Sequence, residues 1–217
     1  AATVAGPAPA ADGAAVTVER SVCYTTAGGE KLCLDIAIPP GDGPFPAVVM
    51  FHGGAWALGS RGELSAGGKD ANGGRKPSWI EVFAEKGYVA ATVSYRLAPK
   101  HRFPAMIEDA RSAIRFLRAN AKAYKIDPDR VAAAGHLALL CGLADKSAGF
   151  DVGDNLDHSG QVKCVVDFFG PTDLAMYAQS GDIEEGYLVP VFGKECKTDP
   201  KVYKKASPVT YVSKDAP

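Results

Sequence analysis

Two stretches of the chain hold residues whose types and spacing suggest chemistry. The first is HGGAW, residues 52–56, which directly follows the apolar run FPAVVMF. Glycine has no Cβ, so the backbone at Gly53 and Gly54 can approach a bound molecule closely. The second is RVAAAGHLALLCGLAD, residues 130–145, where a run of small residues changes to a helical pattern at Gly135. Both stretches therefore lie where a strand is expected to end.

Apolar runs alternate with helical patterns along the chain and predict the elements that position these residues. FPAVVMF lacks alternation, as is typical of a strand buried on both faces, and YVAATVSYR is expected to be the next buried strand. VAAAG predicts a strand of small residues, and VKCVVDFFG is the last clear strand. A helix is expected from Ser78, where SWIE forms a capping box, until Gly87 stops it. Pro104 opens a second helix, and HLALLCGLA predicts a buried third one. IDPDR is expected to be a turn, and the glycine-rich residues 60–77 a loop.

This alternation predicts an α/β fold with βαβ units and a mostly parallel twisted sheet flanked by helices. In such sheets, ligands bind beyond the carboxyl ends of the strands. HGGAW, YRLAP, the junction after VAAAG, and FFGPTD all follow predicted strands. We therefore expect these four segments to meet at one edge of the sheet.

Length and composition limit the class of protein. The 217 residues, 47% of them hydrophobic, are enough for one domain with a sizeable core. The formal net charge of −1 argues against nucleic acid or an anionic membrane as a partner, and no run approaches the ~18 apolar residues of a membrane span. Residues 1–18, rich in Ala, Pro and Gly and without the features of a signal peptide, are expected to form a disordered or extended lead. Residues 19–217 would then form the domain, and its oligomeric state is left open.

Two of the five cysteines lie in a predicted β-hairpin. ERSVCYTTAGGEKLCLDIAIP has Ala27, Gly28 and Gly29 as a three-residue loop, and this register places Cys23 opposite Cys33. Directly opposed cysteines can lie within disulfide reach, and a disulfide would indicate an oxidising compartment, hence a secreted or periplasmic protein. The alternative is two free thiols packed as small hydrophobic residues. The absence of a C-x-x-C pair argues against a zinc or thioredoxin-type site.

Four segments, in order, resemble the esterase/lipase branch of the α/β-hydrolase family, the group of acetyl, feruloyl and hormone-sensitive-lipase-like esterases. They are VVMFHGGAWALGS, YVAATVSYRLAPKHRFPAMIEDARSAIRFLRANA, IDPDRVAAAG followed by HLALL, and VVDFFGPTDL. The resemblance covers about residues 20–217. It implies a carboxylic ester hydrolase that acts on a small-molecule ester by serine acyl-enzyme chemistry, with no metal or organic cofactor.

In that family the HGG segment builds part of the oxyanion hole, where backbone N–H groups stabilise the negative charge that acyl transfer develops on a carbonyl oxygen. The resemblance therefore makes Gly53, Gly54 and Ala55 candidate donors, with Gly54 and Ala55 preferred. It gives His52 a place beside the substrate, where it would orient the loop instead of moving protons. It assigns Trp56 to the acyl side of the pocket. The alternatives are an ordinary glycine turn and, for Trp56, packing in the core.

The family places its nucleophilic serine on a G-x-S-x-G elbow between a strand and a helix. This sequence passes directly from Gly135 to His136, so the elbow and its serine are absent. Connections between strand and helix usually take about 2–6 residues. We therefore expect that Gly135 and His136 are not bonded neighbours in the intact molecule. If they are, a catalytically dead fold used as a binding module becomes the preferred hypothesis; a prolyl-oligopeptidase-like serine peptidase is a further alternative.

The acid and histidine of the triad are expected after two later strands, and no segment of this sequence matches them. The fold is therefore expected to be incomplete at its carboxyl end. His101, His136 and His158 are expected to be structural or solvated, and Asp173 in GPTD resembles a helix cap. Tyr95, with its neighbour Arg96, is expected to brace the loops.

Overall fold

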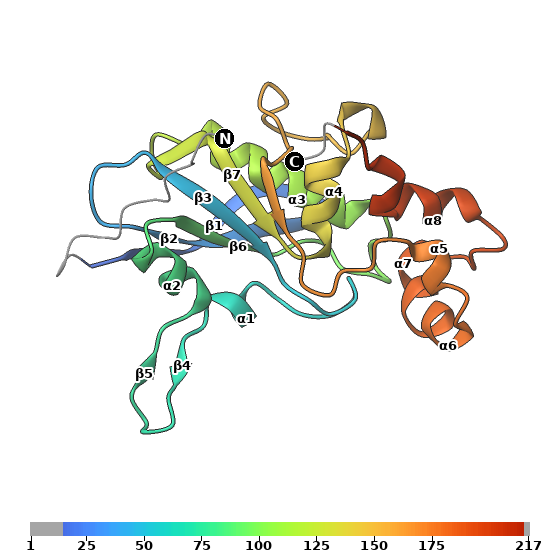
Figure 1. The fold of residues 1–217 in the computed structure, drawn as a ribbon, viewed down its shortest axis with the longest axis horizontal. Coiled ribbons are helices and arrows are strands. Elements are labelled where there is room, and N and C mark those ends of the chain that lie inside the picture. The colour runs from blue at the N-terminus through green and yellow to red at the C-terminus, as the bar shows by residue number, and fades with distance from the viewer. Residues whose placement is uncertain (1–14, 215–217) are drawn as a thin grey trace.

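The computed structural model describes residues 15–214, and a six-stranded sheet lies at the centre of this range (Figure 1). The strand order is β1-β2-β6-β3-β7-β8. The strands are β1 (Thr17–Ala27), β2 (Glu30–Ile38), β3 (Phe45–Phe51), β6 (Val89–Val93), β7 (Ile126–Ala134) and β8 (Cys164–Val166). β6, β3, β7 and β8 run parallel, while β1 and β2 form an antiparallel edge. The expected mostly parallel sheet is confirmed.

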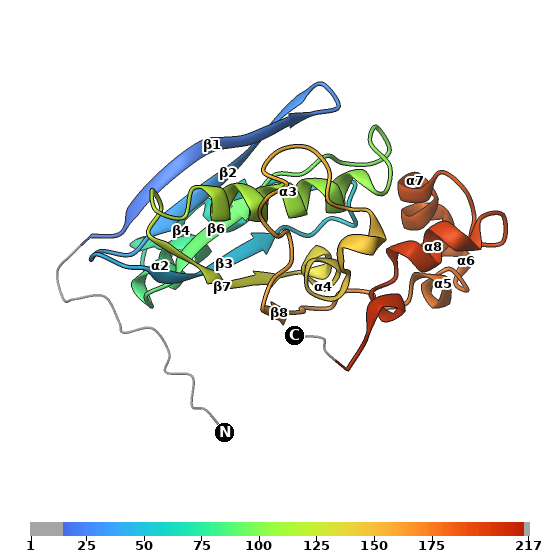
Figure 2. The same cartoon turned by 90° about the horizontal axis from the view of Figure 1, so that it is seen from above.

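Helices cover both faces of this sheet and gather beyond one of its ends. They are α1 (Gly62–Ser65), α2 (Trp79–Glu85), α3 (Ala105–Ala119), α4 (His136–Leu143), α5 (Leu174–Tyr177), α6 (Gly181–Ile183), α7 (Val189–Phe192) and α8 (Pro200–Ala206). A π-helical turn (Glu184–Leu188) joins α6 to α7, and 3₁₀ turns span Lys146–Ala148 and Pro208–Tyr211. Helices α5 to α8 lie beyond the carboxyl ends of β3 and β7 (Figure 2).

The alternation of side chains along β3 divides the core into two layers. Val48 and Met50 pack with Ile80 of α2 on one face. Val49 and Phe51 face the larger layer, which contains α3 and α4. Because both faces of β3 are covered, its run of apolar residues has no polar alternation, and the strand delivers residue 52 to a sheltered end of the sheet.

The predicted helix starts are confirmed at two places. Ser78 caps α2, accepting a hydrogen bond from the Glu81 backbone while the Glu81 side chain accepts one from the Ser78 backbone. Gly87 follows the helix with φ +84°, a conformation that favours glycine. Pro104 directly precedes α3.

The rim between residues 60 and 77 is more ordered than expected. It contains α1 and a two-stranded hairpin, β4 (Gly68–Lys69) with β5 (Arg75–Lys76), which projects from the body of the molecule (Figure 1). Asp70 closes the hairpin by accepting hydrogen bonds from the backbone of Asn72 and Gly74, both at 2.8 Å. Such Asx turns are local, so a polar glycine-rich pattern did not exclude this short hairpin.

Two of the predicted strand limits are wrong. IDPDR is part of β7 instead of a free turn, because Ile126 pairs with Phe45 before the register shifts. VKCVVDFFG contains only the three-residue strand β8, and Cys164 and Val166 are exposed. Within the described part of the chain, β8 pairs with β7 alone, so it lies at the edge of the sheet and is not buried on both sides.

The hairpin of β1 and β2 pairs Cys23 with Cys33 as predicted, but its loop and its register differ from the prediction. Ala27 pairs with Glu30, so the loop consists of Gly28 and Gly29 and not of three residues. An irregularity in β1 just after Cys23 restores the register, and Cys23 lies opposite Cys33. The disulfide between them is present, which confirms the prediction.

The start of β1 at Thr17 assigns the last two residues of the expected lead, Thr17 and Val18, to the sheet. The prediction of a disordered or extended lead also covers residues 1–14, which lie outside the described residues. Among residues 15–214, no helix is both long and apolar enough to cross a membrane.

Candidate functional site

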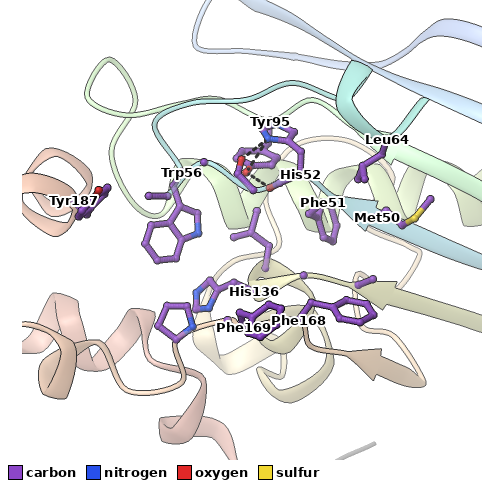
Figure 3. Close-up of a pocket in the computed structure, with 18 of the residues that line it drawn as sticks. Met50, Phe51, His52, Trp56, Leu64, Tyr95, His136, Phe168, Phe169 and Tyr187 are labelled. Carbon is purple, nitrogen blue, oxygen red and sulfur yellow. Dashed lines mark hydrogen bonds between the residues drawn. The ribbon is translucent and has the colours of Figure 1, made fainter. Parts of the chain in front are cut away.

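A cleft of about 800 Å³ lies at the carboxyl ends of β3 and β7 (Figure 3). Its walls come from residues 50–56, the start of α4, the loop 168–171 after β8, and the segment 177–188, with Trp79 and Phe83 contributed by α2. None of the described residues that line it is Ser, Thr, Cys, Asp, Glu, Lys or Arg. The cleft is therefore suited to an uncharged, largely apolar group.

The loop after β3 has an unusual backbone. Gly54, Ala55 and Trp56 have φ values of +107°, +50° and +61°. Such strained residues cluster at ligand sites and persist only when their surroundings hold them. A Cβ at Gly54 would lie 2.3 Å from the carbonyl oxygen of Leu58, so only glycine fits this position.

Gly53, Gly54 and Ala55 line the cleft, and their backbone N–H groups have no protein partners among the described residues. Within residues 15–214, no hydrogen bond is donated by the backbone of Gly53, Gly54 or Ala55. The loop is closed instead by the N–H groups of Ala57 and Leu58, which donate to the Gly54 carbonyl oxygen at 3.0 and 2.9 Å. Gly53 and Gly54 are exposed and Ala55 is half-buried, so water can reach these N–H groups until an oxygen atom of a ligand takes its place. The geometry is compatible with the predicted oxyanion donors, whose role stays a prediction.

His52 is held between the loop and Tyr95. The two rings are stacked with their centroids 4.3 Å apart, and Nδ1 of His52 lies 2.8 Å from the carbonyl oxygen of Gly53. The hydroxyl of Tyr95 donates to the backbone oxygen of His52 at 2.8 Å (Figure 3). Burial lowers the pKa of His52 and raises the pKa of Tyr95. A neutral imidazole bonded to its own loop is a structural brace and not a proton carrier.

The junction between β7 and α4 consists of Gly135 alone. Its N–H donates to the Val166 carbonyl oxygen at 3.1 Å, and its own carbonyl oxygen accepts from Ala138 at 2.9 Å. In the structure a single residue makes this connection, because glycine at φ +106° and ψ +173° turns the chain directly into the helix. His136 is thus the immediate neighbour of Gly135 in this structure, and the connection contains no serine. That further residues separate Gly135 from His136 in the intact molecule stays a prediction.

His136 therefore stands at the site where the nucleophile is expected. Its ring meets the indole of Trp56 edge to face, with the centroids 4.8 Å apart. Its Nδ1 is buried and has no hydrogen-bond partner among the described residues. Burial lowers the pKa of His136 to about 4, against a smaller opposing effect of the Pro171 backbone. Trp56 lines the cleft, as expected, while its assignment to the acyl side stays a prediction.

The other residues considered from sequence lie outside the cleft lining. His101 lies 3.0 Å from Glu30, and Nε2 of His158 lies 3.4 Å from Asp157. Asp173 is the helix cap that was expected, since it accepts hydrogen bonds from the backbone at the start of α5. In residues 15–214, no group of three or more His, Cys, Asp or Glu side chains is placed to hold a metal ion.

Sequence reasoning missed much of the aromatic wall. Trp79, Phe168, Phe169 and Tyr187 line the cleft and are all more than half exposed. A usable signal was FFG, which directly follows a predicted strand at the edge where ligands bind. Trp79 and Tyr187 carried no comparable signal, because both reach the cleft only through tertiary packing.

Comparison with known proteins places this geometry in context. A model of the protein family described as BD-FAE matches residues 34–217. The chain is 27% identical over 185 residues to a probable carboxylic ester hydrolase, LipM, of Mycobacterium tuberculosis, covering 81% of this chain and 39% of that protein. It is 28% identical over 184 residues to the esterase LipC of the same organism, covering 80% and 42%. The chain thus spans about two fifths of the length of these relatives.

A similar fold is found in a solved structure. The propionate-bound thermophilic esterase of Thermogutta terrifontis superposes with a TM-score of 0.69 at 24% identity, covering 95% of this chain and 70% of that one. This likeness shows that the sheet and its flanking helices are those of an α/β-hydrolase.

Proposed function

Because the chain belongs to the BD-FAE family of esterase-like α/β-hydrolases, we propose that it acts on small carboxylic esters. The acyl group would enter the apolar cleft with its carbonyl oxygen against the N–H groups of Gly54 and Ala55, and Gly53 as a further donor. The names of LipM and LipC, a probable carboxylic ester hydrolase and an esterase, support this activity. They lend no support to the peptidase alternative.

One observation carries the proposal: three consecutive residues with unpartnered backbone N–H groups line a cleft whose described lining has no carboxylate, ammonium or guanidinium group. Hydrogen bonds to a developing oxyanion are strongest where water and competing charges are excluded. An ester carbonyl is uncharged when it enters such a site and gains negative charge only as the reaction proceeds. The loop therefore favours the charged intermediate over the bound ester.

The junction at Gly135 favours a second candidate, a module that binds esters or their acids without turnover. Serine acyl-enzyme chemistry needs a hydroxyl at the cleft, and the described lining residues provide neither Ser nor Thr.

For the first candidate, the ester hydrolase, some activity is expected even without a serine. Serine hydrolases that lack a member of the triad retain roughly 10³–10⁴-fold acceleration over water from binding and the oxyanion hole alone. We expect hydrolysis on this reduced scale, with water as the attacking group.

The disulfide supports a proposal about location. Cys23 and Cys33 are bonded in an exposed hairpin, and such bonds persist in oxidising compartments. We expect the protein to work outside the cytoplasm, as a secreted or periplasmic protein.

Turnover and binding are measured separately on the full chain. Release of nitrophenolate from p-nitrophenyl propionate reports hydrolysis, and a propionate titration followed by the fluorescence of Trp56 and Trp79 reports binding. The test variant is Gly54→Ala, in which the new Cβ would lie 2.3 Å from the Leu58 oxygen. Its control is Gly29→Ala, also at positive φ but with no atom within 4 Å of the new Cβ.

We expect the wild-type protein to hydrolyse the ester faster than buffer does. Gly54→Ala should reduce this rate at least about tenfold, because the loss of one oxyanion donor typically lowers kcat by about 10²–10³. Gly29→Ala should retain the wild-type rate. Propionate binding without hydrolysis would support the binding module instead. If the protein neither binds propionate nor hydrolyses the ester, both candidates are wrong.

A further inference from the structure

We infer that Tyr95 is a positioning residue for the N–H groups of the 52–56 loop: by fixing His52 at two points, it aims the N–H groups of Gly53 and Gly54 into the cleft. The inference rests on the proposed function, since it concerns the same N–H groups. It assigns Tyr95 no contact with the reacting atoms and no proton transfer.

The first step follows from the planar trans peptide, in which the C=O and the next N–H point in opposite directions. No cis bond occurs between residues 52 and 55. Whatever binds the carbonyl of one residue therefore sets the direction of the following N–H group. The hydroxyl of Tyr95 holds the His52 oxygen at 2.8 Å, so it sets the direction of the Gly53 N–H.

The second step runs through the imidazole of His52. Nδ1 lies 2.8 Å from the Gly53 carbonyl oxygen, so the proton that it donates fixes this peptide and with it the Gly54 N–H. The ring is oriented by its stack on Tyr95, at an interplanar angle of 8°. Tyr95 thus controls both peptides, one through its hydroxyl and the other through its ring.

Tyr95 can act in this way because it is itself immobilised. It is 5% exposed and follows β6 by two residues. The next residue, Arg96, donates from its backbone to Asp109 of α3 at 2.8 Å, and its guanidinium also binds Asp109. The backbone segment that carries Tyr95 is therefore anchored to α3 independently of the loop that the phenol orients.

The third N–H group provides an internal control. The Ala55 N–H shares its peptide with the Gly54 carbonyl, which is held by Ala57 and Leu58 at 3.0 and 2.9 Å. Its direction depends on the turn and not on Tyr95. A selective effect on Gly53 and Gly54 would therefore separate positioning from general unfolding of the loop.

The test compares amide NMR spectra of the full chain carrying Tyr95→Phe with those of the wild type. This variant keeps the ring and removes the hydroxyl. The matched control is Tyr203→Phe, because Tyr203 is also buried and its hydroxyl donates to a backbone oxygen, that of Lys194, at 2.8 Å, outside the cleft. We expect altered chemical shifts at Gly53 in Tyr95→Phe, with smaller changes at Gly54 and none at Ala55. Tyr203→Phe should leave all three unchanged.

Propionate binding provides the second measurement. Tyr95→Phe should weaken it roughly fivefold to tenfold, the scale of one hydrogen bond, while toluene, which has no oxygen, should bind with unchanged affinity. Unchanged resonances of Gly53 and Gly54 would overturn the inference even if propionate binds. Altered resonances in a protein that does not bind propionate would uphold the positioning and reject the proposed function.

A second variant addresses the ring separately and keeps the test decisive if Tyr95→Phe does not fold. His52→Phe retains an aromatic stack but has no Nδ1, so it should disturb Gly54 and leave Gly53 in place. Equal disturbance of Gly53 and Gly54, or of neither, would contradict the two-point mechanism.

Discussion

The imidazole of His136 lines the cleft, and its protonation affects the free energy of unfolding. Its pKa is about 4 in the folded chain, because burial disfavours the charged form. In the unfolded chain it takes the ordinary value of about 6.5. Between these pH values the unfolded chain binds more protons, so this residue makes the free energy of unfolding fall as pH drops from about 6.5 to about 4.

We predict that His136→Leu reduces this pH dependence. The difference in slope should approach at most about 1.4 kcal/mol per pH unit, the value for one proton. At pH 5 the variant should also be more stable, since an apolar group replaces a buried nitrogen without a partner. Urea unfolding from pH 4 to pH 7 measures both effects, with the more exposed His158→Gln as control. Equal slopes for His136→Leu and the wild type would show that His136 titrates normally.

At the scale of elements, the β1–β2 hairpin depends on its covalent link. The strands close on Gly28 and Gly29, and the disulfide joins positions ten residues apart. Cross-linking a loop of this length stabilises the folded state by about 2–3 kcal/mol through the entropy of the unfolded chain. We predict that the double variant Cys23→Ser, Cys33→Ser loses roughly 2 kcal/mol in urea unfolding and becomes insensitive to dithiothreitol. A wild-type protein already insensitive to the reductant would contradict this.

The sequence predicted elements whose signals are local. Ser78 and Glu81 are three residues apart and form a capping box, and Cys23 faces Cys33 because a tight turn and an irregularity in β1 together set the register. The geometry of the one-residue junction could not be predicted, because it depends on a distant strand. A Cβ at Gly135 would lie 2.9 Å from the oxygen of Phe51, a contact that no local pattern encodes.

Two buried arginines show the same limit. Arg111 and Arg115 of α3 are fully buried, and both bind Asp151, at 2.7 Å for each pair. The long loop before β8 folds back over the helix, and only the structure reveals this ion-pair cluster. Likewise, the HGG motif indicated a site from the sequence. The positioning role inferred for Tyr95 could be derived only from the structure, because it depends on the direction of each peptide group in the loop.

For the molecule as a whole, β8 is an edge of the sheet within the described residues, and apolar side chains are exposed there. Val166 is 42% exposed, and Phe168 and Phe169 beside it are 68% and 101% exposed. Open edges with apolar side chains are templates for pairing with another chain. We predict that the full chain associates as its concentration rises and that Val166→Lys suppresses this.

Sedimentation velocity over a concentration series measures the effect. Val209→Lys is the matched control, because Val209 is 51% exposed and lies on the 3₁₀ turn Pro208–Tyr211, away from the edge. Equal association in both variants would mean that another surface joins the chains.

The junction at Gly135 also constrains how this lineage can evolve. A serine at position 135 would need φ near +106° and would press its Cβ against the Phe51 oxygen at 2.9 Å, and a serine at position 136 would stand within the first turn of α4. Neither codon change rebuilds an elbow. At this junction, an elbow is rebuilt by an in-frame insertion of several codons and not by a base substitution.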